Sequence, residues 1–155
     1  MGLEIERRFL VDGEAWRTLG EACAYRQGYL SVDPARTVRV RIVGNQAWMT
    51  LKAKITDTSR HEFEYPIPVE DAKIIMSTMC SQPIEKNRTR VSFSGHIWEV
   101  DEFFGANQGL VLAEIELPSE DALFEKPVWV GREITADGRY TNAYLADHPY
   151  SSWRD

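Results

Sequence analysis

Charged and apolar residues alternate along nearly every extended segment of this 155-residue chain. The stretch EIERR near the N-terminus is the first example, with Glu4, Glu6 and Arg8 at alternate positions. Side chains two positions apart on a strand lie on the same face of a sheet, so these three charges share one face. The same spacing recurs in TVRVRI, TLKAKI, HEFEYPI, EKNRTRV, WEVDEF and AEIELP. The pattern predicts strands with one charged face and one apolar face.

Segments of this kind, bounded by Gly, Pro, Asp or Asn, predict eight strands. They lie near residues 3–11, 23–31, 36–44, 46–54, 61–67, 86–93, 95–102 and 109–117. The connections at 44–46 and 94–96 are short and contain glycine, which is typical of hairpin loops. Strands that are neighbours in the sequence are therefore expected to be antiparallel neighbours in space.

Helical patterns are fewer, and they are predicted at 13–20, 69–81 and 139–147. Thr135 or Asp137 is expected to start the last of them. A further short helix is predicted after Pro118, with Ser119 as its N-cap. Because no internal repeat or linker interrupts the pattern, residues 1–155 are expected to form a single domain of the α+β class, mostly β.

The charges on the predicted strands are unusually dense. A sheet face in water normally carries Thr, Ser, Gln and Asn as well, and such an open solvated face remains one reading of the pattern. The alternative is that the eight strands close into an antiparallel barrel with the apolar face outward under flanking helices and the charges in the lumen. The basic residues are Arg8, Arg39, Arg41, Lys52, Lys54, Lys86, Arg88 and Arg90. The acidic residues are Glu4, Glu6, Glu62, Glu64, Glu99, Asp101, Glu114 and Glu116.

A lumen lined in this way would be costly to leave empty, because charges removed from water need partners. A polyanion would satisfy the basic side chains, and a divalent metal would satisfy the carboxylates. The closed-barrel reading therefore predicts a site that binds an anionic small molecule together with a metal.

The composition of the chain limits the classes of partner that it is expected to bind. Eighteen basic against 24 acidic residues give a net charge of −6, which argues against a nucleic-acid-binding surface. No segment approaches the roughly 18 apolar residues needed to cross a bilayer, so no membrane contact is expected. The two cysteines, Cys23 and Cys80, match no metal-binding spacing and favour a reducing cytoplasm. The five tryptophans leave a homodimer contact open.

The N-terminal EIERRFLV resembles the E-x-E-x-K signature of the CYTH superfamily, the triphosphate tunnel metalloenzymes. The resemblance continues in order through QGYL, TVRVRI, TLKAK, EFEYPIP, IEKNRTRV, WEVDEF, GLVLAEIEL, PVWVGREIT and RYTNAYL, and so covers nearly the whole chain. It implies an eight-stranded antiparallel tunnel, and hydrolysis or cyclisation at a triphosphate chain with Mg²⁺ or Mn²⁺. The short bacterial members, which are mostly inorganic triphosphatases, are the most similar.

The resemblance also implies roles for individual residues. The metal ligands would be Glu4, Glu6, Glu114 and Glu116. The triphosphate would be bound by Arg8, Arg39, Arg41, Lys52, Lys54, Lys86, Arg88 and Arg90, since guanidinium and ammonium groups suit phosphoryl oxygens. The remaining carboxylates, Glu62, Glu64, Glu99 and Asp101, would orient these cations or bind metal-associated water.

Two positions qualify the resemblance. Arg8 stands where the family usually has Lys, which keeps the charge but not the capacity to lose a proton. Lys52 and Tyr29 match a Lys–Tyr pair that serves as the base in some relatives, although Tyr29 also reads as a packed aromatic residue.

Three functions follow from these observations. The first is a metal-dependent phosphohydrolase acting on inorganic triphosphate, with nucleoside or thiamine triphosphates as further substrates. The second is an adenylate cyclase of the class IV type, in which a 3′-hydroxyl attacks the α-phosphate. The third is a non-catalytic module that binds polyphosphate or another anion, which would not need the four metal-binding glutamates.

Overall fold

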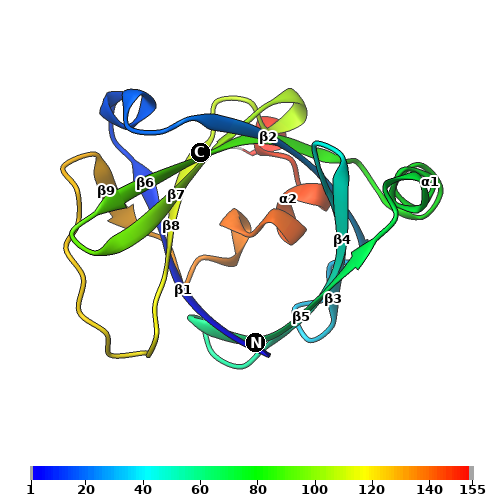
Figure 1. Ribbon diagram of the computed structural model, residues 1–155, viewed down its shortest axis with the longest axis horizontal. Coiled ribbons are helices and arrows are strands. Elements are labelled where there is room, and N and C mark those ends of the chain that lie inside the picture. Colours follow the sequence, from blue (N-terminus) through cyan, green and yellow to red (C-terminus); the bar gives the residue numbers. More distant parts are fainter. Residues whose placement is uncertain (1, 154–155) are drawn as a thin grey trace.

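Residues 2–153 are described by the computed structural model. Eight antiparallel strands form a closed ring, which is visible in Figure 1. They are β1 (Leu3–Val11), β2 (Ala22–Ser31), β3 (Thr37–Val43), β4 (Gln46–Lys54), β5 (Ser59–Ile67), β6 (Ile84–Phe93), β7 (His96–Phe103) and β8 (Val111–Glu116). Their order around the barrel is β5-β4-β3-β2-β6-β7-β8-β1, and β5 pairs with β1 to complete the ring. The predicted closed eight-stranded barrel is confirmed.

Strand β1 closes the barrel and has three neighbours. Its first residues, Leu3–Ile5, pair with β5, and Glu6–Leu10 pair with β8. A ninth strand, β9 (Val130–Glu133), pairs with the end of β1. It lies along the edge of β1 that pairs with β5 only over the first residues. This strand is absent from the predicted set, because four residues are too few to show a period of two.

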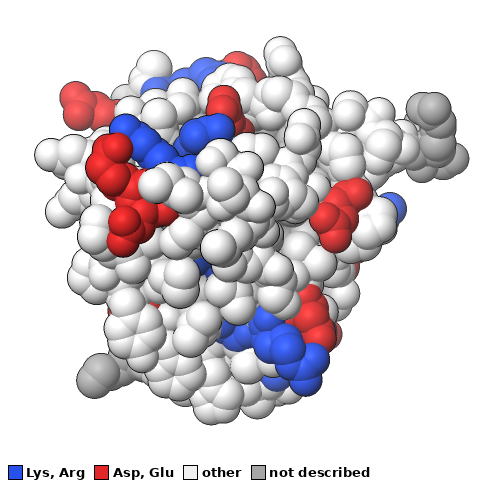
Figure 2. Space-filling model, turned by 90° about the vertical axis from the view of Figure 1, so that its right-hand side faces the viewer, with Lys and Arg blue, Asp and Glu red and all other residues white. Residues whose placement is uncertain are grey.

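Helix α1 (Val69–Met79) packs on the outside of the barrel, as Figure 1 shows. Ala72 and Met76, one helical turn apart, are buried against Val40 and Ala47 of the barrel wall. The helix predicted at 69–81 is therefore confirmed. Figure 2 shows this side of the molecule, where charged side chains form small separate groups on a largely uncharged surface.

The C-terminal segment differs from a flanking helix, because it lies within the ring in Figure 1. It contains a 3₁₀ turn at Gly138–Tyr140 and helix α2 (Asn142–Asp147). Asp137 caps the first and Thr141 caps the second, each by accepting a hydrogen bond from a backbone N–H group. The predicted helix at 139–147 is thus formed, but in two short pieces.

Helix α2 is held inside the barrel by apolar contacts. Leu145 and Ala146 are buried in a cluster with Ile84, Phe103 and Leu112, which come from β6, β7 and β8. The helix therefore fills one end of the lumen.

Two helix predictions need correction. The segment 13–20 forms only a 3₁₀ turn at Ala15–Thr18. The helix predicted after Pro118 is wrong, since residues 118–121 form bends and a turn. The hydroxyl of Ser119 donates to the side chain of Asp121 and does not cap a helix.

The largest apolar cluster lies on the outer side of β1, β7 and β8. Phe9 and Trp98 are at most 1% exposed and meet edge to face, with ring centroids 5.5 Å apart. Trp16 and Trp129 belong to the same cluster, so three of the tryptophans are core residues and not a surface contact. Within residues 2–153, no helix is long and apolar enough to span a membrane.

Candidate active site

The barrel encloses a cavity of about 690 Å³. Side chains from all eight barrel strands line it, and residues 135–148 of the C-terminal segment close part of it. The alternation in the sequence explains this lining, because every second residue of a strand points inward. The charged face predicted from the sequence is therefore the lumen, and the open solvated sheet is not what the chain forms.

The strand order separates the charges into two walls. Strands β7, β8, β1 and β5 are consecutive around the ring, and they supply all the acidic side chains that the barrel strands contribute to the cavity lining. Strands β6, β2, β3 and β4 form the opposite half and supply most of the basic ones. Arg8 on β1 and Arg60 on β5 are the two basic side chains of the cavity lining that come from the acidic wall. A polyanion and a divalent cation could therefore bind side by side, each against its own wall.

Lys86 and Arg88 of β6 share the buried carboxylate of Asp101. Lys86 Nζ lies 2.7 Å from Asp101 Oδ2, while Arg88 bonds both carboxylate oxygens at 2.8 and 2.9 Å. Burial opposes the ionisation of Asp101, but the charges of Arg88 and Lys86 outweigh it and hold the pKa of Asp101 well below its usual range. Arg88 also reaches Glu114, at 3.3 Å. Asp101 is thus fixed as an anion that orients two cations.

Burial lowers the pKa of Lys86 to about 7, although the negative charge of Asp101 opposes this shift. The positive charges of Arg88 and Arg41 lower the pKa of Lys86 further. An anion bound beside Lys86 would favour the charged ammonium form and raise this pKa again. The protonation state of Lys86 is therefore coupled to the occupancy of the lumen.

Arg41 and Arg39 of β3 are positioned by polar side chains of the neighbouring strands. Arg41 Nε donates to Gln27 Oε1 at 2.9 Å, and burial lowers the pKa of Arg41 to about 10 with the help of Arg39 and Arg88. Arg39 donates to Thr50 at 3.1 Å. The ring of Tyr25 lies between Arg41 and Arg88, with centroid distances of 4.9 and 5.1 Å.

Three guanidinium groups of the lumen have an unused donor. The Nε atoms of Arg8, Arg39 and Arg60 are buried and have no hydrogen-bond partner within residues 2–153. A buried donor without a partner costs about 1–3 kcal/mol, so such groups normally bind water or a ligand. A water molecule or a ligand that bonded these Nε atoms after a rearrangement of the side chains would remove this cost.

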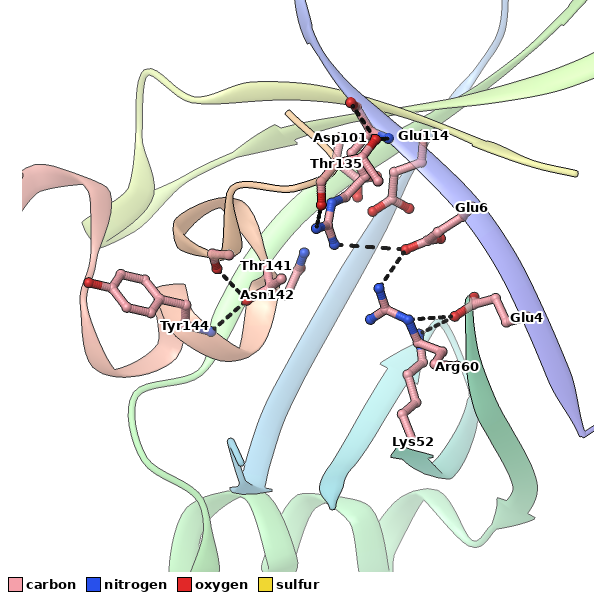
Figure 3. Close-up of polar contacts among 12 residues, drawn as sticks. Glu4, Glu6, Lys52, Arg60, Asp101, Glu114, Thr135, Thr141, Asn142 and Tyr144 are labelled. Atoms are coloured by element: carbon pink, nitrogen blue, oxygen red, sulfur yellow. Dashed lines mark hydrogen bonds and ion pairs between the residues drawn. The ribbon is translucent and has the colours of Figure 1, made fainter. Parts of the chain in front are cut away.

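The four carboxylates predicted to bind metal all line the cavity. Glu4 lies 3.1 Å from Lys52 and 3.6 Å from Arg60, and Glu6 lies 3.9 Å from Arg8 and 4.0 Å from Arg60, as Figure 3 shows in part. Glu4 and Glu6 thus form ion pairs with basic side chains of the protein.

Glu116 differs from the other three. It lies opposite Glu6 on the neighbouring strand, and within residues 2–153 it forms no hydrogen bond or ion pair of its side chain. Burial raises its pKa, and the negative charges of Glu4, Glu62, Glu6 and Glu99 raise it further. A divalent cation among these carboxylates would remove the repulsion.

The oxygen donors therefore suit Mg²⁺ or Mn²⁺ by charge and by ligand type. Within the described residues, no three acidic, histidine or cysteine side chains already stand close enough together to hold a metal ion. Metal binding would consequently require Glu4 and Glu6 to exchange their cationic partners for the metal.

The predicted Lys52–Tyr29 pair is not joined by a hydrogen bond in the described part of the chain. Lys52 Nζ lies 3.1 Å from Glu4 and 3.5 Å from Glu62. Tyr29 lines the cavity but is 6% exposed and accepts a hydrogen bond from Gln27 Nε2 at 3.1 Å. The tyrosine is both a packed aromatic residue and a part of the lumen.

Two predicted cations lie toward the outside. Lys54 lines the cavity, but its side chain is half exposed and pairs with Asp57 at 3.0 Å. Arg90 is not part of the lining; its side chain is 66% exposed and lies 3.7 Å from Glu99. The strand face that carries Arg88 thus extends beyond the enclosed lumen.

Arg60 and Asn142 are among the lumen residues that are missing from the sequence predictions. Arg60 shares the face of Glu62 and Glu64, but the predicted strand begins one residue after it; the real strand begins at Ser59. Asn142 of α2 accepts hydrogen bonds from Gln27 at 3.0 Å and from Lys86 at 2.9 Å. Nothing in the sequence indicates that this asparagine enters the barrel.

Comparisons with known proteins agree with these features. A family model described as the CYTH domain matches residues 2–143. An inorganic triphosphatase of Acetivibrio thermocellus is 48% identical over 156 residues, which cover 100% of each chain. One of Nitrosomonas europaea is 38% identical over 151 residues, covering 92% of this chain and 96% of its own. A crystal structure of an inorganic triphosphatase has a TM-score of 0.64 and 36% identity, and covers 92% of this chain and 96% of its own.

The hydrogen bonds of Asn142 predict how α2 is kept in the lumen. Replacing Asn142 with Leu removes the acceptor shared by Gln27 and Lys86, each bond being worth about 1–3 kcal/mol at a buried site. Amide hydrogen exchange in residues 142–147 should become about ten-fold faster or more, while exchange in the barrel strands stays unchanged. Asn142→Asp keeps the acceptor and should preserve the protection. Equal exchange in the Leu variant and the parent protein would show that apolar contacts alone hold α2.

Proposed function

This chain belongs to the CYTH domain family, and we propose that it is a metal-dependent phosphohydrolase that cleaves inorganic triphosphate in the barrel lumen. One observation carries the proposal. A basic wall and an acidic wall face each other across one cavity, and guanidinium groups of this cavity have Nε donors without a partner among the described residues. The names of the two curated relatives supply the substrate class.

The basic wall would bind the substrate. Arg39 and Arg41 would grip the triphosphate from β3, and Lys86 and Arg88 from β6, with Lys52 and Lys54 nearer the opening. Arg8 would complete the contact from the opposite wall, since its Nε has no hydrogen-bond partner among the described residues. These cations would also neutralise the charge that spreads over the equatorial oxygens during phosphoryl transfer.

The acidic wall would bind Mg²⁺ or Mn²⁺ through Glu4, Glu6, Glu114 and Glu116. When bound, the cation would polarise a phosphoryl group and position a water molecule. Glu62, Glu64 and Glu99 would orient the cations across the cavity. The oxygen of the water forms a bond to a terminal phosphorus, the bridging P–O bond breaks, and diphosphate and phosphate leave.

The attacking water must lose a proton, and we assign its acceptor to the Lys52–Tyr29 pair. Both residues line the cavity, and Lys52 would accept the proton as a neutral amine, after giving up its ion pairs with Glu4 and Glu62. The assignment rests on the family resemblance. Arg8 stands outside this role, because a guanidinium does not release its proton in proteins.

The setting is proposed to be a reducing cytoplasm, since Cys23 and Cys80 are both free. Cyclic AMP formation from ATP is the alternative reaction at the same site. It requires space for a nucleoside beyond the triphosphate, and α2 reduces that space at one end of the lumen.

The reaction is tested by measuring phosphate and cyclic AMP release from triphosphate and from ATP, each with Mg²⁺ and with Mn²⁺. Phosphate release from triphosphate should be fastest, and no cyclic AMP should form. A cyclic product would establish the cyclase. Absence of both products, with triphosphate still bound, would establish a binding module.

The metal site is tested with Glu116→Gln. Loss of this carboxylate should lower turnover by about 100-fold, because a charged metal ligand is removed. The metal-free variant should nevertheless melt at a slightly higher temperature, since the neighbouring glutamates disfavour the charge of Glu116. The matched control is Glu85→Gln, which replaces an exposed glutamate on β6. It should change neither the turnover nor the melting temperature. Full turnover in the Glu116→Gln variant would show that Glu116 is not a metal ligand.

The pKa of Lys86 predicts proton uptake on binding. With a pKa of about 7 in the free protein, Lys86 is mostly neutral at pH 8, and a bound triphosphate should recharge it. Calorimetric titrations in two buffers with different protonation enthalpies should therefore show about one more proton taken up than in Lys86→Arg, which stays charged. Equal uptake in the two proteins would contradict the lowered pKa.

A further inference from the structure

Arg60 lies between the two N-terminal carboxylates of the acidic wall. Its Nε is 3.6 Å from Glu4 Oε1, and its terminal nitrogen is 4.0 Å from Glu6 Oε1. The strand register places it there, because Arg60 is the direct cross-strand partner of Glu4 where β5 closes against β1. Figure 3 shows the guanidinium pointing toward both carboxylates.

The contacts of Arg60 are electrostatic and not directional. Within residues 2–153 its side chain donates no hydrogen bond, and its Nε is buried without a partner. The side chain is only 17% exposed. A guanidinium has five N–H donors, and none of those of Arg60 is fixed by a protein acceptor within residues 2–153, so the side chain is held by charge and not by directional bonds.

Other basic side chains of the lumen also contact residues that are not proposed metal ligands. Lys52 also pairs with Glu62, and Arg8 also donates to the backbone oxygen of Thr135. The two ion pairs of Arg60 within the described residues, by contrast, both go to proposed metal ligands. If Glu4 and Glu6 turn to a divalent cation, Arg60 therefore loses its whole counter-charge and meets a positive charge in its place.

We propose that Arg60 is the exchangeable counter-charge of this site and an additional triphosphate-binding residue. It neutralises Glu4 and Glu6 in the metal-free protein. When a divalent cation takes these carboxylates, the guanidinium turns to the triphosphate and donates to its oxygens. This role rests on the proposed function, because it requires both a metal and a phosphate chain in the lumen.

The inference predicts opposite effects of one substitution on the two ligands. Arg60→Gln removes the internal competitor, so Mn²⁺ alone should bind the metal-free protein about ten-fold more tightly, as measured by the electron paramagnetic resonance signal of free Mn²⁺. The same variant should raise the KM for triphosphate with Mg²⁺ about ten-fold, because a charge-assisted contact is lost. A static, purely structural arginine would weaken both ligands.

Two further variants control the experiment. Arg26→Gln makes the same charge change at an exposed ion pair with Glu85 and should alter Mn²⁺ affinity less than two-fold. Arg60→Lys keeps the charge and should retain the parent Mn²⁺ affinity. If Arg60→Gln is less stable, the rise in its melting temperature on adding Mn²⁺ should still exceed that of the parent.

The outcomes separate the two proposals. Mn²⁺ affinity in Arg60→Gln that is equal to or weaker than in the parent would overturn the role of Arg60 while leaving the triphosphatase proposal intact. A parent protein that binds no Mn²⁺ would overturn the metal site and, with it, the exchange of Arg60.

Discussion

Charge pairing across an enclosed lumen is the constraint on which this structure depends. Closing eight alternating strands into a barrel points every second side chain of a strand inward, and here those side chains are mostly charged and several of them are buried. Buried charges are tolerated only when they are paired and hydrogen-bonded. The Lys86–Asp101–Arg88 group meets this demand fully. Within residues 2–153, the buried Nε donors of Arg8 and Arg39 have no hydrogen-bond partner, and the more exposed Glu116 forms no ion pair; these groups mark where ligands would complete the pairing.

The strand order determines how this incomplete pairing is arranged. Because β7, β8, β1 and β5 are contiguous, their carboxylates face one another and repel, while the guanidinium and ammonium groups of β6, β3 and β4 face them across the cavity. A metal and a polyanion would each relieve the repulsion within one wall. Helix α2 is tied to the basic half at one end of the lumen, since Asn142 accepts hydrogen bonds from Gln27 of β2 and Lys86 of β6. Lys86, which would bind triphosphate, thus also helps to hold the C-terminal segment in place.

Much of this architecture could be predicted from the sequence, because a period of two specifies which side chains share a face. The eight strands, the closed barrel and the charged lumen follow from residues such as Arg39, Arg41, Glu114 and Glu116. Positions that depend on three-dimensional packing could not be predicted. Asn142 enters the lumen because α2 packs on Ile84 and Phe103, and Ser119 bonds a neighbouring side chain where a helix cap was expected. Arg60 could have been predicted, since it shares the face of Glu62, but the predicted strand began two residues too late, at residue 61 and not at Ser59.

The central claim is that metal and triphosphate share one cavity. The most direct test is a calorimetric titration of the protein with a poorly hydrolysed triphosphate analogue, with and without Mg²⁺ and corrected for Mg²⁺ bound by the free analogue. If the two walls act together, Mg²⁺ should tighten the binding of the analogue about ten-fold or more, and the analogue should tighten the binding of Mg²⁺ by the same factor. Equal affinity for the analogue in the two titrations would contradict the account, because the carboxylates and the phosphate-binding cations would then not interact.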